Sequence, residues 1–378
     1  MNEAPAASIR ECFGDIEDPR VEGRCDYPLM EIITIAIGAV IAGADSWTDV
    51  ETFGKSKVSW LKQFLKLEHG IPSHDTFGDV FRMIDADAFQ RSFRRWIDQV
   101  FTVTKGQIIA IDGKTMVGSQ DKTIGKGAIH LVNAWATANG ISLGQRKVDA
   151  KSNEITAIPE LLDLLSINGC IVTIDAMGCQ KRIAQKIRDN HADYVLCLKG
   201  NQGQLLQDVQ EWFAYADQVA FQGMAHDYHE TVNKAHGRLE RRRCWAVADP
   251  VAFEYIRHYE GWADLHTIVR VERERRFADH IEQETAYFIS SLAPVAPRIL
   301  EATRLHWAVE NCFHWVLDVT FHDDASRIRK DNSPQNMAVL RTLALNILKQ
   351  DTSKASLKQK RYRVALDDAF LLHLLTQV

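Results

Sequence analysis

The spacing of apolar residues changes near residue 106, and this change limits the possible folds more than any other feature of the chain. Before that point apolar side chains recur every three or four residues, which is typical of amphipathic helices. After it they form short runs bounded by turn residues, which is typical of strands. The change predicts a helical N-terminal domain, residues 1–104, in front of a core built around a sheet. The expected helices of this domain cover residues 29–44, 45–67 and 77–100.

The order of elements after residue 106 narrows the fold class further. Three expected strands come first, and Asn139 and Gly140 between the second and the third are a strong signal for a hairpin turn. Strands joined by turns and then by helical crossovers indicate an α/β fold, with a mixed sheet that has an antiparallel edge and is flanked by helices. The expected strands are 107–111, 129–137, 141–148, 170–174 and 193–198, and the expected helices are 154–165 and 180–190.

The regular alternation of strands and helices is lost between residues 203 and 292. This stretch holds one expected helix, near 205–215, and strand-like pieces at 244–248, 266–271 and 285–290. We interpret it as an inserted, β-rich segment. A helix with apolar residues from 300 to 317 then resumes the core. The expected division is therefore 105–202 for the first part of the core, 203–292 for the insertion, 293–350 for the last part of the core and 351–378 for a C-terminal tail.

The charge of the chain bears on its partners. A net charge of -5 disfavours nucleic-acid binding, because the release of counterions from phosphates requires clustered lysine and arginine. Such clusters occur at 238–243, 270–276 and 349–363, although each is also compatible with an ordinary solvated surface.

The sequence contains no signal for a membrane or for export. The longest apolar run, 32–44, is shorter than the roughly 20 residues that span a bilayer, so we expect it to be a buried helix. The N-terminus carries acidic residues where a signal peptide needs a basic start. We expect a cytoplasmic protein that does not bind a membrane.

Two aspartates each follow an expected buried strand. Asp112 comes after 107–111 and Asp175 after 170–174. If these strands are neighbours, both carboxylates emerge at one edge of the sheet, where open sheets expose their chemistry. Carboxylate oxygens suit Mg²⁺ or Mn²⁺, and paired ions of this kind catalyse phosphoryl transfer. Glu310 on the late helix is the candidate third ligand. Spacing alone does not choose it over its acidic neighbours, which are Asp318, Asp323 and Asp324.

The chain resembles the DDE transposases of bacterial insertion sequences, and in particular their H-repeat-associated subgroup. The resemblance covers nearly the whole chain and includes the two aspartates and the glutamate. The matching stretches are DPR at 18–20, GIPSHDTF at 70–77, IDGK at 111–114, KSNEI at 151–155, TIDA at 173–176, LKGNQ at 198–202, HGRLE at 236–240 and HWAVEN at 306–311.

The resemblance implies a fold, an activity and a set of partners. It implies a ribonuclease H-like fold with a β-rich insertion before the glutamate helix, and Mg²⁺ or Mn²⁺ bound by Asp112, Asp175 and Glu310. The implied reaction cuts phosphodiester bonds at transposon ends and joins the freed 3′-hydroxyl to target DNA. The implied partners are double-stranded DNA with terminal inverted repeats, target DNA and a second copy of the chain in a homodimer on DNA. The implied location is the bacterial nucleoid.

Several residues are candidates for contact with DNA. Some lie beside the expected carboxylates or in the insertion, and others stand near the glutamate. The candidates are Lys114, Lys199, Asn201, Gln202, His236, Arg238, Arg241, Arg304 and His306. Trp307 and Trp315 are eight residues apart on the late helix, and we expect them to pack in the core rather than to stack on bases.

The chain also departs from the pattern of related transposases. Thr303, His306 and Leu317 stand where relatives carry a tyrosine, an arginine and a lysine, and Val117 stands where the family tends to have an arginine. The phosphate-binding role of the family's arginine and lysine must then be taken by other residues, and the candidates are Arg304, Arg327 and Arg329. Two alternatives stay open. One is a catalytically inactive DNA-binding relative, and the other is a nuclease of the same fold that does not join strands.

Overall fold

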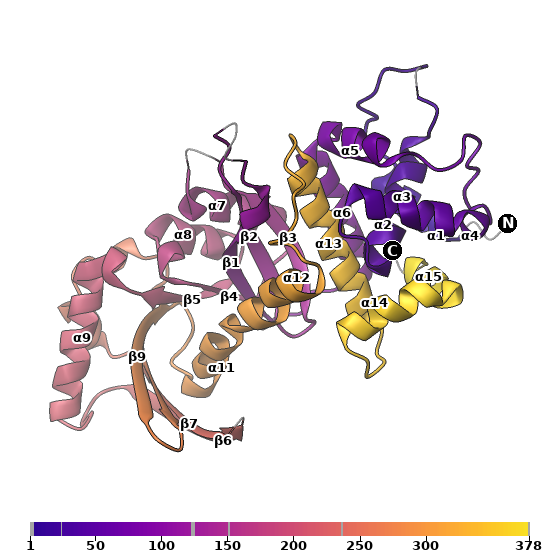
Figure 1. The fold of residues 1–378 in the computed structure, drawn as a ribbon. Helices are drawn as coiled ribbons and strands as arrows, with labels where there is room; N and C mark the ends of the chain where they lie inside the picture. Colours follow the sequence, from indigo (N-terminus) through magenta and orange to yellow (C-terminus); the bar gives the residue numbers. More distant parts are fainter. Residues whose placement is uncertain (1–3, 24, 122–124, 150–151, 236, 377–378) are drawn as a thin grey trace.

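A computed structural model describes residues 4–376, apart from residues 24, 122–124, 150–151 and 236. Its centre is a nine-stranded sheet with the strand order β3-β2-β1-β4-β5-β9-β8-β7-β6. Helices flank this sheet, and a group of further helices lies beyond the β3 edge (Figure 1). The structure confirms the expected fold class, which is a mixed α/β sheet flanked by helices and extended by a β-rich insertion.

The first three strands form the antiparallel edge that the sequence predicts. They are β1 (Ile108–Met116), β2 (Ile129–Ala136) and β3 (Ile141–Lys147). The turn between β2 and β3 uses Gly140 at φ +66°, a conformation that glycine adopts without a steric cost. The prediction for β1 was wrong at its end, because the strand continues from Ile111 to Met116. The Asp-Gly pair at 112–113 suggested a turn, but β2 pairs with β1 as far as Met116.

The parallel part of the sheet continues from β1. Strands β4 (Ile171–Ile174) and β5 (Asp193–Leu198) both run parallel to β1. The crossover helices are α7 (Glu154–Leu164) and α8 (Lys181–Asp189), and a short 3-10 turn, η3 (Ala176–Gly178), follows β4. A side chain at Gly113 would displace the carboxylate of Glu154, at the start of α7, and the ring of His130, which are hydrogen-bonded to each other above this glycine.

The insertion extends the same sheet rather than forming a separate one. Strand β9 pairs antiparallel with β5, and β8, β7 and β6 follow, each antiparallel to its neighbour. The three predicted strand pieces overlap β7, β8 and β9, whereas β6 was not predicted because its polar sequence has no apolar alternation. The elements are α9 (Gly203–Gln218), η4 (Gly200–Gln202), β6 (His226–Ala235), β7 (Arg238–Val247), α10 (Pro250–Tyr255), η5 (Tyr259–Gly261), β8 (Thr267–Arg276) and β9 (Ile281–Ser290).

The late helix is interrupted at the candidate glutamate. Instead of one helix from 300 to 317, the chain forms α11 (Ala296–His306), a π-helical turn η6 (Glu310–His314) and α12 (Trp315–Thr320). The backbone N–H of Trp315 donates to the carbonyl of Glu310, which is the five-residue spacing of a π-turn. Such turns insert one residue into a helix and often mark functional sites.

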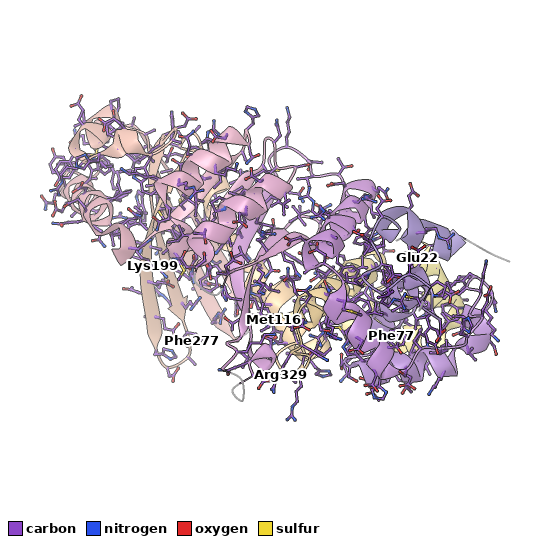
Figure 2. All side chains as sticks on the ribbon, turned by 90° about the horizontal axis from the view of Figure 1, so that it is seen from above. Glu22, Phe77, Met116, Lys199, Phe277 and Arg329 are labelled. Carbon is purple, nitrogen blue, oxygen red and sulfur yellow. The ribbon has the colours of Figure 1, made fainter. Side chains whose placement is uncertain are left out.

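The remaining helices gather at the β3 edge. Helix α13 packs against α2, α5, α6 and β3, and α14 and α15 pack on α2, so the C-terminal helices lie beside the N-terminal ones (Figure 1). Viewed from above, Phe77 of α5 lies in this helical half, and Lys199 and Phe277 lie in the other half (Figure 2). The helices are α1 (Ala4–Phe13), α2 (Leu29–Ala42), α3 (Trp47–Ser56), α4 (Val58–Leu61), α5 (His74–Met83), α6 (Ala86–Val100), α13 (Ser333–Gln350), α14 (Leu357–Leu366) and α15 (Asp368–Leu375), with one 3-10 turn, η1 (Val117–Ser119), after β1.

The apolar run at 32–44 belongs to α2, which is buried along most of its length as predicted. Within the described residues no single helix has the length and apolar character to cross a membrane. The bent pair α2 and α3 satisfies those criteria by length and composition only.

Candidate active site

The register of two parallel strands places Asp112 beside Asp175. The last paired residues of β1 and β4 are Ile111 and Ile174, and the two aspartates come next on each strand. Residues at the same level of adjacent parallel strands point to the same face of a sheet. Asp175 also begins the η3 turn, where its carboxylate accepts a hydrogen bond from the N–H of Met177 at 3.0 Å.

The π-turn brings Glu310 to the same place. His314 links the two acids, with its Nδ1 3.2 Å from Glu310 Oε2 and 3.6 Å from Asp112 Oδ2. The potential ligand atoms of Asp112, Glu310 and His314 all lie within 4.8 Å of one another. Phe313 stacks on Trp135 of β2 with ring centroids 5.1 Å apart, which anchors the turn to the sheet.

A cavity of about 330 Å³ opens where these side chains meet. The three acidic residues line it together with residues from β5, β8, β9 and α11. Its lining includes Asp112, Asp175 and Glu310, and also Lys199, Arg273, Glu284, Thr303, His306 and Trp307. Acidic residues that are far apart in the sequence therefore share one cavity, and Asp112 is close to both of the others.

The electrostatics of the cavity favour a cation. Burial raises the pKa of Asp112 to about 7, and the negative charges of Asp175, Glu154 and Glu310 add to this effect, although a hydrogen bond from the N–H of Gly113 opposes it. A carboxylate under this much repulsion is stabilised either by a proton or by a bound cation. A set of carboxylate oxygens is also the donor chemistry that Mg²⁺ and Mn²⁺ prefer.

Two histidines belong to the site, and sequence reasoning found only one of them. His306 lines the cavity with its Nδ1 3.1 Å from Thr173 Oγ1, and burial lowers its pKa, opposed by the charge of Asp175. His314 was missed, although its spacing of four residues from Glu310 places both on one helical face. Burial lowers the pKa of His314, opposed by the hydrogen bond with Glu310.

The comparisons with known proteins show the family of the chain. The family model described as "Transposase DDE domain" matches residues 103–347. The chain belongs to this DDE transposase family. The model described as "DDE_Tnp_1-associated" matches residues 10–97, which covers most of the N-terminal helices.

Full-length relatives of this family member come from Escherichia coli. "Putative transposase YncI" of strain O157:H7 is 40% identical, over 96% of this chain and 93% of the relative. "H repeat-associated putative transposase YhhI" of strain K12 is 39% identical, over 97% of each chain. A piggyBac transposase, solved by cryo-electron microscopy in a synaptic complex with hairpin DNA, is more distant. Its TM-score is 0.44 at 9% identity, over 98% of this chain and 81% of that chain.

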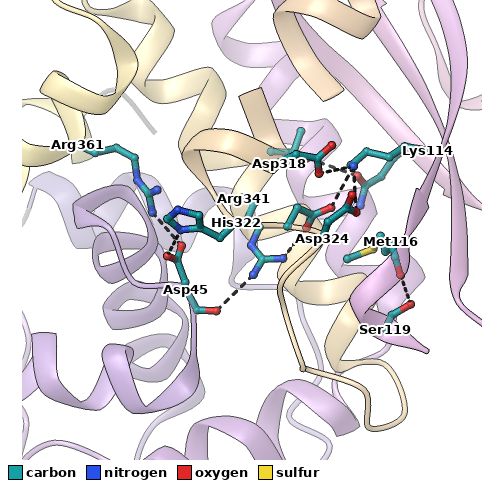
Figure 3. Close-up of polar contacts among 12 residues, drawn as sticks. Asp45, Lys114, Met116, Ser119, Asp318, His322, Asp324, Arg341 and Arg361 are labelled. Carbon is teal, nitrogen blue, oxygen red and sulfur yellow. Dashed lines mark hydrogen bonds and ion pairs between the residues drawn. The ribbon is translucent and has the colours of Figure 1, made fainter. Parts of the chain in front are cut away.

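Lys114 was predicted to contact DNA, but the structure buries it. Its side chain is 8% exposed, and its Nζ lies 2.6 Å from Asp318 and 3.5 Å from Asp324 (Figure 3). In this family member Lys114 therefore ties β1 to the segment around α12. Asp318, Asp323 and Asp324 form a second acidic group that does not line the cavity and that pairs with Lys114 and Arg341. Of the four acidic candidates on and after the late helix, Glu310 is therefore the one that lines the cavity with Asp112.

Asn201 and Gln202 were also predicted to contact DNA, but their amide nitrogens hold the loop after Asp175. Asn201 Nδ2 donates to the carbonyl of Ala176 at 2.6 Å, and Gln202 Nε2 donates to the carbonyl of Cys179 at 2.9 Å. Their place in the structure supports a role in positioning Asp175. Lys199, which precedes them, is exposed and lines the cavity.

Arginines line a second hollow of about 280 Å³ beside the cavity. Its lining is Arg238, Glu240, Arg242, Arg273, Arg275, Arg304, Trp307 and Asn311, of which Arg273 and Trp307 also line the cavity. Burial lowers the pKa of Arg242, and the positive charges of Arg304 and Arg273 lower it further, although Glu240 opposes them. Within the described residues, three of the five lining arginines form ion pairs, Arg242 with Glu240, Arg273 with Glu284 and Arg275 with Glu282. The arginines outnumber these carboxylates, so the hollow keeps an excess of positive charge, as expected of a surface that binds anions.

Not every predicted basic residue faces that hollow. Arg241 alternates to the other face of β7, where its guanidinium is 2.8 Å from Glu230. Arg329 donates from Nε to the carbonyl of Gly118 at 3.0 Å. His236 lies outside the described residues.

The prediction that Trp307 and Trp315 pack in the core was wrong. Their side chains are 53% and 58% exposed. The guanidinium of Arg273 lies 5.8 Å from the centre of the Trp307 ring, at the border between the cavity and the arginine-lined hollow. Helical spacing alone placed both tryptophans on one face, but it could not show that this face borders an opening.

Proposed function

We propose that this protein is a DNA transposase that cuts phosphodiester bonds at transposon ends and joins the freed 3′-hydroxyl to target DNA. The proposal assigns Asp112, Asp175 and Glu310 to two divalent ions, Mg²⁺ or Mn²⁺. The observation that carries it is the meeting of these carboxylates in one cavity, although they come from β1, the end of β4 and the π-turn.

Each acidic residue has a distinct part in this proposal. Asp112 is adjacent to both other acids, so it is the ligand that two ions can share. Asp175 is oriented by the N–H groups of the η3 turn, and Glu310 by the hydrogen bond with His314. When bound, a pair of such ions activates the attacking oxygen and stabilises the leaving oxygen of a phosphodiester.

The arginine-lined hollow provides a path for DNA next to the cavity. In this proposal Arg242, Arg273 and Arg304, which line the hollow, pair with phosphates of the DNA backbone where it enters the site. Arg304 thereby takes the phosphate-binding role for which the chain lacks the usual family residues. Lys199 lies on the lining of the cavity and serves the same purpose there.

The partners follow from this assignment. They are double-stranded DNA with terminal inverted repeats and target DNA, and the protein acts on them in the cytoplasm, at the bacterial nucleoid. Two ends must be held together to be joined, which requires at least a homodimer on DNA. We assign recognition of element ends or assembly to the helical N-terminal domain, residues 1–104.

The test is an assay of nicking and joining on a duplex that carries the sequences flanking the gene. Mg²⁺-dependent nicks and joined products are expected from the wild-type chain, and Asp175→Ala should reduce both at least about 1,000-fold. Asp163→Asn, on the exposed part of α7, is the matched control and should retain activity, because its ion pair with Lys186 lies at the surface.

Two results would contradict the proposal, and each corresponds to an alternative. Binding of the duplex without any metal-dependent nicking would identify an inactive DNA-binding relative. Nicking without joined products would identify a nuclease of the same fold. The first alternative derives from the departures at Val117, His306 and Leu317, of which Leu317 is only 6% exposed.

A further inference from the structure

His314 is a buried polar residue at the centre of the site. Its side chain is 4% exposed, and its Nδ1 faces both Glu310 and Asp112. Its other ring nitrogen, Nε2, is buried and has no hydrogen-bond partner within the described part of the chain. Burying imidazole in this way costs free energy, so the residue requires an explanation beyond packing.

The positions of the three side chains match part of a coordination sphere. Adjacent ligands of an octahedral ion with bonds of about 2.1 Å are about 3.0 Å apart. The separations from His314 Nδ1 are 3.2 Å to Glu310 Oε2 and 3.6 Å to Asp112 Oδ2, and all three potential ligand atoms lie within 4.8 Å of one another. Small movements of the side chains would allow one ion to contact all three.

The backbone holds His314 in this position. It is the last residue of the π-turn, and Phe313 before it is fully buried against Trp135. A histidine on an exposed loop could swing away, whereas this one is fixed by its neighbours. An imidazole so placed adds a nitrogen donor to a site that otherwise offers carboxylate oxygens.

We propose that His314 supplies a nitrogen ligand to the divalent ion held by Asp112 and Glu310, so that this ion site favours Mn²⁺ over Mg²⁺. The proposal rests on the proposed function, because it assumes that these carboxylates bind an ion. Mn²⁺ benefits more than Mg²⁺ from a nitrogen donor, since Mg²⁺ strongly prefers oxygen ligands and ordered water. The competing role for His314 is positional, in which Nδ1–H only donates a hydrogen bond to Glu310.

Pulsed electron paramagnetic resonance on the full-length protein with Mn²⁺ alone separates the two roles. Bound Mn²⁺ should show coupling to a directly bonded ¹⁴N nucleus, and labelling of the histidines with ¹⁵N should convert it to ¹⁵N coupling. This measurement needs no substitution, so it does not depend on the folding of a variant. A role limited to positioning predicts no directly bonded nitrogen.

Substitutions then assign the nitrogen to a residue. His314→Gln should abolish the coupling and weaken Mn²⁺ binding by at least about tenfold, with a smaller effect on Mg²⁺. His306→Gln, in the same cavity, is the matched control and should retain the coupling. Retention of the coupling in His314→Gln, or equal losses of Mn²⁺ and Mg²⁺ affinity, would overturn the proposal.

The same experiment separates failure of this inference from failure of the proposed function. If Mn²⁺ binds the wild-type chain, is lost in Asp112→Asn and shows no nitrogen coupling, the carboxylate centre stands and only the role of His314 is refuted. If the wild-type chain and Asp112→Asn bind Mn²⁺ equally, the metal centre itself is refuted.

Discussion

At Asp112 burial and neighbouring charge act in the same direction. The pKa of about 7 means that the metal-free folded protein holds a proton on this carboxyl at pH values where the unfolded chain has already released it. A site that binds divalent ions is expected to carry this strain, because the ions neutralise it. The same residue therefore limits the stability of the empty protein and enables its proposed chemistry.

This strain predicts a pH dependence of stability in the absence of metal. The folded pKa of Asp112 is raised above the unfolded value, so its contribution is fully present below about pH 4 and is lost as the pH rises to about 7. The loss has an upper bound of about 4 kcal/mol, which follows from a rise of about three pKa units. The measurement is urea unfolding of the wild-type protein and of Asp112→Asn in EDTA. As the pH rises over this range, the unfolding free energy of the wild-type protein should fall relative to that of the variant. A difference in unfolding free energy between the two proteins that does not change with pH would contradict the raised pKa of Asp112.

Two features of the backbone shape the site at the level of elements. The shared register of β1 and β4 sets Asp112 beside Asp175, and the π-turn sets Glu310 and His314 against them. Phe313 lies between those two residues in sequence and points into the core. The position of the third carboxylate therefore depends on the packing of an apolar neighbour.

Truncation of Phe313 should accordingly impair both stability and catalysis. Phe313→Ala is expected to cost about 3–5 kcal/mol of unfolding free energy, and Phe313→Leu about 1 kcal/mol. Phe313→Leu should nevertheless reduce the nicking rate more than its stability change explains, because Glu310 loses its fixed position. Cys312→Ala, at the exposed position next to it, should change stability by less than about 0.5 kcal/mol. A Phe313→Leu variant with the wild-type rate would contradict this reasoning.

Across the whole molecule, α13 joins the terminal helices to the sheet. Asn336 donates from Nδ2 to the carbonyls of Phe81 and Ile84, and Asn346 exchanges hydrogen bonds with the backbone of Ser142 on β3. The β3 edge of the sheet is thereby covered, which prevents β3 from pairing with a strand of another chain. Helices α14 and α15 then pack on α2, so the C-terminal tail belongs to the folded unit.

The packing of the tail predicts a large effect of a single substitution there. Leu371 of α15 is fully buried, and Leu371→Ala should cost about 2–5 kcal/mol of unfolding free energy. Tyr362→Ala on α14, where the side chain is 70% exposed, should cost less than about 0.5 kcal/mol. Thermal and urea unfolding measure both values. Equal stability of the two variants would show that the tail does not contribute to the core.

The interpretations that succeeded from sequence depended on local information. Apolar spacing located most helices and strands, and Asn139 with Gly140 located the hairpin turn. The identities of Asp112, Asp175 and Glu310 as candidates also came from sequence, through strand ends and the family resemblance. Propensity, periodicity and turn chemistry act within a few residues, and a short stretch of sequence therefore contains them.

What failed from sequence depended on contacts between distant segments. The continuation of β1 past Asp112 is decided by its pairing with β2, and the burial of Lys114 by carboxylates in α12 and just after it. The exposure of Trp307 is decided by the opening that the insertion leaves beside α11. Sequence alone determined which residues are candidates for the chemistry, whereas the tertiary structure decided which of them meet, because register, burial and ion pairing are properties of segments brought together only by folding.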